Sequence, residues 1–330
     1  MKDVLEIVRA TGANAAHLRP LWTSWMAGEE LALSSRRGAP PRGLIEVLPR
    51  LRDSLHSLAH VMSEHPSDDG SCRLLVRLHD GATVESVLLA RDALCISTQV
   101  GCAVACRFCK TGESGLLRQL TVGEMLAQVA LGRARRAVKR VVLMGMGEPA
   151  HNLDAVLEVL TWLGDHGRFA HKNLVFSTVG ERRAFERLAQ HTVKPALALS
   201  LHTTKPALRA ELLPKAPRIE PAELLLLACD YADATGHPLQ VQWTLLRGVN
   251  DGDDEIEALA TLLAGRRAIV NLIPWNTVEG FAFERPDPLR ARDMVRELKA
   301  RGVLATIRRS GAQDVEGACG QLRARARPQR

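Results

Sequence analysis

Three cysteines within one short stretch are the residues of this chain best suited to hold a metal centre. Cys102, Cys106 and Cys109 are spaced CxxxCxxC, and no fourth ligand lies at a coordinating spacing nearby. A closed structural zinc site takes four protein ligands, usually from two CxxC pairs. Three thiolates leave one metal position open, which favours a 4Fe–4S cluster whose unique iron is chelated by S-adenosylmethionine. The alternatives are an incomplete zinc site and a chance group of cysteines.

Further polar residues follow the apolar runs of a pattern in which strands alternate with helices. The predicted strands span Leu94–Gln99, Arg140–Met144, Asn173–Ser177, Ala196–Leu201, Leu239–Leu245 and Ile269–Pro274. The predicted helices lie near 121–136, 152–164, 181–190, 221–234, 253–263 and 288–301, and a last strand spans Val303–Arg308. Thr121 and Glu124 form a T-x-x-E capping box where the first of these helices begins. Alternation of this kind predicts a parallel sheet.

The groups with chemical potential fall where the predicted strands end. They are the three cysteines, Gly147 and Glu148, Ser177, Ser200 with Leu201 and His202, and Asn276. In a barrel of alternating strands and helices, the carboxyl ends of the strands share one rim, and active sites are built there. Six units predict an open, partial (β/α)6 TIM-like barrel, whose open side would admit a large substrate.

The segments before the barrel have a different character. Residues 1–70 are predicted to form a small helical accessory region, interrupted by a linker at 36–43, and possible RNA binding is assigned to it. Residues 71–93 are predicted to form a β-hairpin extension, because an Asp-Gly pair at 80–81 separates two β-rich runs. The barrel itself is assigned to 94–322, and residues 323–330 form a basic tail.

Composition places the chain among ordinary globular proteins. Its 330 residues are 46% hydrophobic and 25% charged. No apolar run approaches the roughly 20 residues that a membrane span needs, and acidic residues stand where a signal peptide would have its apolar stretch. We therefore expect a cytoplasmic protein without membrane contact, whose seven cysteines serve metal or thiol chemistry rather than a disulfide framework.

The charge balance favours polyanionic partners. The formal net charge is +7, and basic residues gather in two places: Arg133, Arg135, Arg136, Lys139 and Arg140 in one segment, and Arg323, Arg325, Arg327 and Arg330 at the end. A solvated helix face and a charged tail are the alternative reading of these groups. Aromatic residues make up 4% of the chain, which argues against a platform that stacks single-stranded RNA.

Several motifs together resemble a known family. The stretch from Cys102 to Cys109, with Phe108 before the last cysteine, resembles the signature of radical S-adenosylmethionine enzymes. Five further motifs match, in order, the RlmN/Cfr family of RNA adenine methyltransferases: GMGEP at 145–149, SLH at 200–202, VNDG at 249–252, IPWN at 273–276 and ACGQL at 318–322. The resemblance covers roughly residues 70 to 322, and the ordered set is far more specific than any single motif.

The resemblance implies methylation of carbon 2 of an adenine in ribosomal RNA, transfer RNA or both, with two molecules of S-adenosylmethionine per turnover. Cys319 would carry the methyl group as S-methylcysteine, and a 5′-deoxyadenosyl radical would activate it for addition to the base. Cys95 would then attack the Cys319 sulfur, so that a transient disulfide forms and the methylated base is released. Glu85 matches the proton acceptor of the family.

The resemblance also implies the cofactor contacts and partners. The residues that match cofactor contacts are Gly147, Glu148, Ser177, Ser200, Leu201, His202 and Asn276. An electron donor such as flavodoxin or ferredoxin is implied, and we expect a monomer. Lys110 departs from the family, which usually has a small residue there, and it would add positive charge near the cluster or an RNA phosphate. Two alternatives stay open: the same mechanism at carbon 8, as in Cfr-like members, and a non-catalytic, metal-bearing RNA-binding protein.

Overall fold

The computed structural model describes residues 1–33, 39–113, 115–276 and 280–308. Its helices are α1 (Lys2–Arg9), α2 (Ala15–Ala27), α3 (Arg42–His56), α4 (Lys110–Glu113), α5 (Val122–Arg133), α6 (Leu153–Asp165), α7 (Arg182–Gln190), α8 (Pro206–Leu212), α9 (Pro221–Thr235), α10 (Asp253–Leu262) and α11 (Pro288–Ala300), with short 3-10 turns at Pro149–Asn152 and His171–Asn173. Its strands are β1 (Ala59–Pro66), β2 (Cys72–Leu78), β3 (Thr83–Leu89), β4 (Ala93–Cys95), β5 (Gln99–Gly101), β6 (Leu116–Gln119), β7 (Arg140–Leu143), β8 (Leu174–Thr178), β9 (Ala196–Ser200), β10 (Leu239–Leu245), β11 (Ala268–Pro274) and β12 (Leu304–Ile307).

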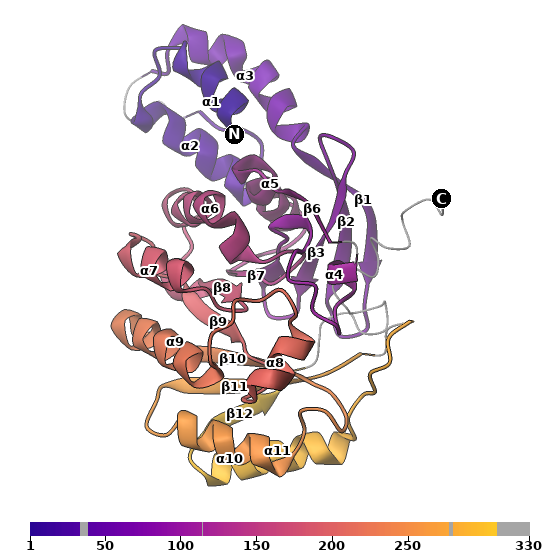
Figure 1. Cartoon of the computed structure of the whole chain (residues 1–330). Helices are drawn as coiled ribbons and strands as arrows, with labels where there is room; N and C mark the ends of the chain where they lie inside the picture. Colours follow the sequence, from indigo (N-terminus) through magenta and orange to yellow (C-terminus); the bar gives the residue numbers. More distant parts are fainter. Residues whose placement is uncertain (34–38, 114, 277–279, 309–330) are drawn as a thin grey trace.

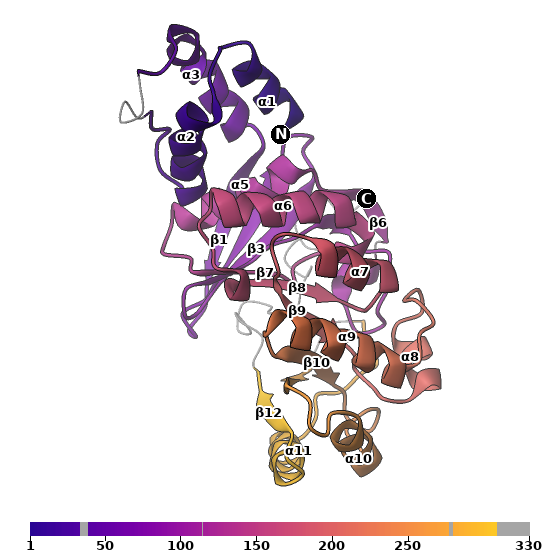
Figure 2. The same ribbon diagram turned by 90° about the vertical axis from the view of Figure 1, so that its left-hand side faces the viewer.

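Ten of these strands form one curved, open sheet. Their order is β1-β2-β3-β4-β7-β8-β9-β10-β11-β12. The first four pair antiparallel, and from β4 to β12 every neighbouring pair is parallel. Helices α5, α6, α7, α9, α10 and α11 cover one side of the sheet (Figures 1 and 2). The predicted partial (β/α)6 barrel is therefore confirmed, with β12 as a seventh parallel strand at its edge.

The elements form for the reasons that the sequence suggests. Strand β8 is buried along its whole length, as expected for a parallel strand covered on both faces. Helix α5 begins with the predicted capping box, in which Thr121 Oγ1 accepts from Glu124 N at 3.3 Å and Glu124 Oε2 accepts from Thr121 N at 2.8 Å. These reciprocal bonds satisfy two backbone donors that have no partner within the helix.

The structure corrects two sequence predictions. The segment 59–66, assigned above to a helical region, forms strand β1 and pairs with β2 through a bulge between Val61 and Ser63. Its alternating burial is that of a strand with one covered face, but its polar and histidine residues hid the pattern. The predicted strand Leu94–Gln99 ends at Cys95, and residues 99–101 form β5, which pairs with β6 in a separate two-stranded sheet.

The N-terminal helices are packed onto the barrel. Helix α2 contacts α5, and α3 contacts both α5 and β1; α1–α3 stack at the β1 end of the molecule in Figure 1. Their buried residues Leu21, Met26 and Leu44 belong to the same hydrophobic cluster as Leu126 of α5. Among the residues that the structure describes, no helix has the length and apolar character required to cross a bilayer.

Candidate active site

A cavity of about 380 Å³ gathers most of the predicted site residues. Its lining includes Glu85, Cys95, Cys102, Cys106, Cys109, Gly147, Glu148, Ser177, Ser200, His202 and Asn276. The side chain of Leu201 is instead fully buried in the main hydrophobic cluster, and Cys319 lies outside the described residues. The cavity thus brings together the predicted groups at the ends of the parallel strands with Cys95 and Glu85, which were predicted from the family resemblance.

The cysteine loop is fixed by its neighbours on both sides. Gly101 precedes it with φ +85°, and a Cβ at this position would lie 1.9 Å from the carbonyl oxygen of Gly115. That same carbonyl accepts from the backbone N–H of Cys102 at 3.0 Å. At the other end, Trp275 Nε1 donates to the carbonyl of Phe108 at 3.0 Å. The loop therefore starts at a position that only glycine fits.

The three cysteine sulfurs suit a cluster better than a single zinc ion. Zn–S bonds of ~2.3 Å place tetrahedral ligands about 3.8 Å apart. The three cysteine sulfurs do not all lie within 4.8 Å of one another, because the one group of candidate ligands that meets this criterion among the described residues is a different one. They are therefore too far apart to share a single zinc ion. Burial raises the pKa of all three thiols, that of Cys102 to about 12. A cation in the cavity would supply the stabilisation that such buried thiolates lack.

Glu148 ties together the ends of two strands at the cavity. Its Oε2 accepts from the backbone N–H of Val179 at 2.9 Å, and its Oε1 accepts from that of Ala150 at 3.0 Å. The residue is 5% exposed, and burial raises the pKa of its carboxyl above the ordinary value although these bonds oppose the shift. Gly147 before it has φ +108°, and a Cβ there would lie 2.6 Å from the Gln99 side chain. Glycine is thus required by the backbone and by packing.

His202 is held in one orientation as a neutral ring. Its backbone has the unusual φ of +66°, and its Nδ1 accepts from Thr244 N at 2.9 Å. Burial, helped by Arg209, lowers its pKa to about 3. Because Nδ1 accepts, the proton of the neutral ring belongs on Nε2, which makes that atom a hydrogen-bond donor.

The VNDG motif has a structural explanation in the same place. The Asn250 side chain donates to the carbonyls of His202 at 2.7 Å and Thr244 at 2.8 Å, and it accepts from Leu246 N at 2.8 Å. Asn250 is fully buried. The motif therefore braces the strained backbone of His202 rather than contacting the cavity itself.

Two polar side chains in the cavity lining have unsatisfied atoms. Within the described part of the chain, both amide atoms of Asn276 and the Nε2 of Gln242 are buried without a hydrogen-bond partner. Buried polar atoms in native proteins are normally paired. These residues therefore fit a polar ligand such as S-adenosylmethionine.

A second group of residues approaches the cavity from the hairpin side. Glu85 forms an ion pair with Arg73, and both side chains are only 2% exposed. Cys95 is buried among Val142 and Val175, and burial raises the pKa of its thiol to about 12, with Glu85 adding to the shift. This part of the cavity is thus largely apolar, with one buried charge pair.

The sequence analysis missed several cavity residues. They are Arg73, Gln242 and Arg308. The available signal was a polar residue inside an apolar strand, as in CRLLVRL of β2 and LQVQWTL of β10. A polar side chain at such a position needs a partner or a ligand when it is buried.

The basic segment 133–140 is mostly committed to contacts within the chain. The contacts are Arg133 with the carbonyls of Met26 and Gly167, Arg135 with Glu64, Arg136 with the carbonyl of Gly70, and Lys139 with Asp92. Among the described residues, Arg140 is the member of this segment without such a partner. Lys110 pairs with Glu113 at 2.7 Å and lines the cavity.

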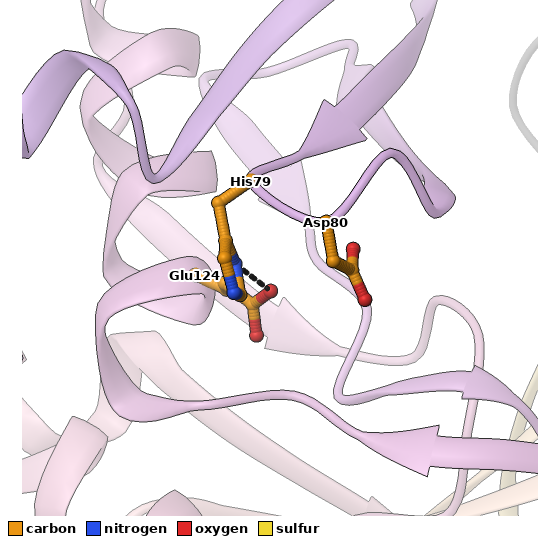
Figure 3. A group of neighbouring side chains, drawn as sticks. All are labelled: His79, Asp80 and Glu124. Carbon is orange, nitrogen blue, oxygen red and sulfur yellow. Dashed lines mark hydrogen bonds and ion pairs between the residues drawn. The ribbon is translucent and has the colours of Figure 1, made fainter.

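His79, Asp80 and Glu124 lie close together at the start of α5, and His79 contacts Glu124 (Figure 3). His79 Nδ1 lies 3.1 Å from Glu124 Oε1. Arg118 pairs with Asp80 and with Glu124, each at 2.7 Å. Arg118 bridges both carboxylates, so the contacts of this group tie the hairpin to α5.

The fold, the cysteine loop and the polar groups at the strand ends are those of a radical S-adenosylmethionine protein. Comparison with known proteins supports this assignment. Residues 96–263 match the radical SAM superfamily, to which the chain belongs. The superfamily uses a 4Fe–4S cluster and S-adenosylmethionine, as predicted.

Relatives are similar over nearly the whole chain. A probable RNA methyltransferase from Methylibium petroleiphilum is 59% identical, over 99% of this chain and 93% of the relative. Another from Thiobacillus denitrificans is 57% identical, over 99% and 91%. The crystal structure of a radical SAM methyltransferase from Sphaerobacter thermophilus is 35% identical with a TM-score of 0.83, over 97% of this chain and 96% of that one. The family resemblance inferred from the motifs is confirmed.

Proposed function

We propose that this protein methylates carbon 2 of an adenine in RNA, in ribosomal RNA, transfer RNA or both. One observation carries the proposal: the predicted resolving thiol of Cys95 lines the same cavity as the three predicted cluster ligands. The names of the relatives, probable RNA methyltransferases, support RNA as the substrate class. Carbon 2 comes from the family resemblance.

The chain's residues divide the work as follows. Cys102, Cys106 and Cys109 would hold the cluster, which when bound supplies reductive cleavage of S-adenosylmethionine with an electron from a donor such as flavodoxin or ferredoxin. Gly147, Glu148, Ser177, Ser200, His202 and Asn276, which line the cavity, would hold S-adenosylmethionine. Leu201 matches a further cofactor contact of the family, and because its side chain is buried in the main hydrophobic cluster, its contact would come from the backbone. His202 would donate through Nε2, because its Nδ1 is occupied.

The residues on the hairpin side of the cavity would carry out the proton transfer and the thiol–disulfide exchange. Cys319 carries the methyl group, Glu85 accepts the proton that the ring carbon loses, and Cys95 closes the disulfide with Cys319. Arg73 holds the Glu85 carboxylate in place through their ion pair. A raised pKa keeps the Cys95 thiol protonated. Disulfide exchange needs a thiolate, so a proton acceptor must act in this cavity. The Glu85 carboxylate lies close enough to raise the pKa of the thiol and is the candidate for that role.

Mass spectrometry of nucleosides tests the proposal. RNA from cells with the gene should contain 2-methyladenosine that is missing from cells without it, and separated ribosomal and transfer RNA would identify the target. 8-Methyladenosine would instead support the carbon 8 alternative. No difference in any methyladenosine, together with RNA binding that survives Cys319→Ala, would support a non-catalytic RNA-binding protein.

The roles of the two thiols are tested with purified variants. Cys95→Ala should accumulate a covalent protein–RNA adduct, because the linkage forms but is not resolved. Cys319→Ala should form no adduct. Equal behaviour of the two variants on denaturing gels would contradict the division of roles.

A further inference from the structure

Of two glutamines on strand β10, only one lines the cavity, and its side-chain amide has an N–H group, unpaired among the described residues, that could bind a ligand. Gln240 and Gln242 are two residues apart, so their side chains leave the strand on the same face. Gln242 lines the cavity and is 4% exposed, whereas Gln240 is half-buried and is not part of the lining. Within the described part of the chain, the Gln242 Nε2 has no hydrogen-bond partner.

The Gln242 backbone is held firmly against the predicted cofactor contacts. Its register partner on β9 is Ser200, and its carbonyl accepts from Leu201 N at 3.1 Å. Two residues further along the strand, Thr244 N donates to His202 Nδ1. The backbone that carries the Gln242 side chain is therefore fixed before any ligand arrives, which reduces the entropy lost on binding.

The carboxamide of glutamine offers a donor and an acceptor side by side. Adenine presents the complementary pair, an amino donor beside a ring-nitrogen acceptor, and glutamine commonly pairs with it in this way. The superfamily's own cofactor contains an adenine ring, and the proposed substrate provides another. Both rings would lie in or at this cavity.

We propose that Gln242 hydrogen-bonds the adenine ring of a nucleoside bound in the cavity. The ring belongs either to S-adenosylmethionine or to the target adenosine of RNA. The second case rests on the proposed function, and the first does not. In either case Gln242 is a specificity-determining residue, because an unpaired buried amide N–H disfavours ligands that lack the matching acceptor.

The test compares Gln242→Leu with the matched control Gln240→Leu, which removes the same group from the same strand outside the cavity. Each reconstituted holoenzyme is assayed for iron content, for the Kd of S-adenosylmethionine by anaerobic equilibrium dialysis without RNA, and for methyladenosine formed in deproteinised large-subunit ribosomal RNA at saturating cofactor. Gln242→Glu is a second variant that keeps the side-chain shape and loses the donor. It decides the outcome if Gln242→Leu fails to fold or to load iron.

Either of two results supports the proposal. A roughly 5- to 150-fold weaker Kd for S-adenosylmethionine assigns the contact to the cofactor. An unchanged Kd with a similar loss in kcat/KM for RNA assigns it to the target base. If the Gln242 variants match Gln240→Leu in both measurements, the proposal is wrong and water satisfies the amide. If the wild-type protein methylates no RNA, the proposed function fails, and the cofactor measurement alone decides the role of Gln242.

Discussion

Buried polar residues determine the chemistry of the cavity at the scale of single side chains. His202 and Asn250 form one unit: the asparagine carboxamide satisfies the His202 carbonyl, and the Thr244 backbone occupies the Nδ1 of the ring. The imidazole is consequently uncharged and oriented before any ligand binds. A neutral donor is suited to a cofactor whose sulfonium already carries positive charge.

The neutral state of His202 should make stability depend on pH. Its pKa is about 3 in the folded protein and about 6.5 in the unfolded chain. Between these values the unfolded chain binds a proton that the folded protein does not, so stability falls as the pH falls. From pH 7 to pH 5 this residue should cost about 2 kcal/mol. Urea unfolding at both pH values should show that wild type loses this much more stability than His202→Gln, and equal losses would contradict the prediction.

Loss of one partner of the Arg73–Glu85 ion pair should destabilise the protein more than loss of both. Arg73→Met would leave the Glu85 carboxylate buried beside the apolar wall of the cavity, which should destabilise the protein by about 3–5 kcal/mol. The double variant Arg73→Met, Glu85→Gln removes the buried charge and should recover part of that loss. Denaturant unfolding of the wild type, both single variants and the double variant measures the coupling. Additive losses would mean that the two side chains do not depend on each other.

At the scale of elements, the short β5–β6 sheet positions the cysteine loop. Gly101→Ala should prevent this, because the backbone is in the left-handed region and the new Cβ would meet the Gly115 carbonyl oxygen. We expect a large loss of bound iron and of thermal stability. Gly70→Ala is the control: its φ of +80° is similar, but no atom lies within 4 Å of the added Cβ. Iron analysis after reconstitution that gives equal content for both variants would show that the close approach is unimportant.

The local sequence pattern predicted most helices and strands, and it failed where the pairing of one strand with another determines the structure. Strand β10 was predicted with its observed bounds, because Leu239–Leu245 is a β-rich run between turn residues. Strand β1 was missed, since an edge strand with one covered face is specified by its partner β2 more than by its own residues. The division of 94–101 into β4 and β5 follows from the pairing of Gly101 with β6, a contact that no local pattern contains.

The candidate site was predictable to a similar extent. The rule that polar groups at strand ends share a rim brought Glu148, Ser177 and His202 to one cavity, as observed. Cys95 and Glu85 were recognisable only through the family resemblance, because a cysteine or a glutamate in a strand has no distinctive pattern. Arg73 and Gln242 depend on which face of a strand points inward, and that is fixed by the assembled sheet.

At the scale of the whole molecule, the N-terminal helices and the barrel share one core. Buried residues of α2 and α3 pack in the same cluster as α5, so the region is part of the barrel's support. A helical region held in this way presents its outer surface at a fixed orientation to the cavity. Any RNA contact that it makes would therefore be set geometrically relative to the site of methylation.

The positive charge of the whole molecule should appear as a steep salt dependence of RNA affinity. Each phosphate neutralised by a basic side chain releases counterions, so the logarithm of the affinity falls linearly with the logarithm of the salt concentration.

Arg140 has no intramolecular partner among the described residues, and Arg140→Gln should lower this slope by about 0.7–0.9 if it contacts a phosphate. Arg135→Gln is the matched control, because Arg135 is held by Glu64 at 2.8 Å and by the Leu131 carbonyl at 2.8 Å, and its slope should equal that of wild type. Filter binding to large-subunit ribosomal RNA between 50 and 200 mM salt measures all three slopes. A flat response of the wild type would show that the net charge of +7 does not serve RNA binding, and equal slopes for the two variants would remove Arg140 from the interface.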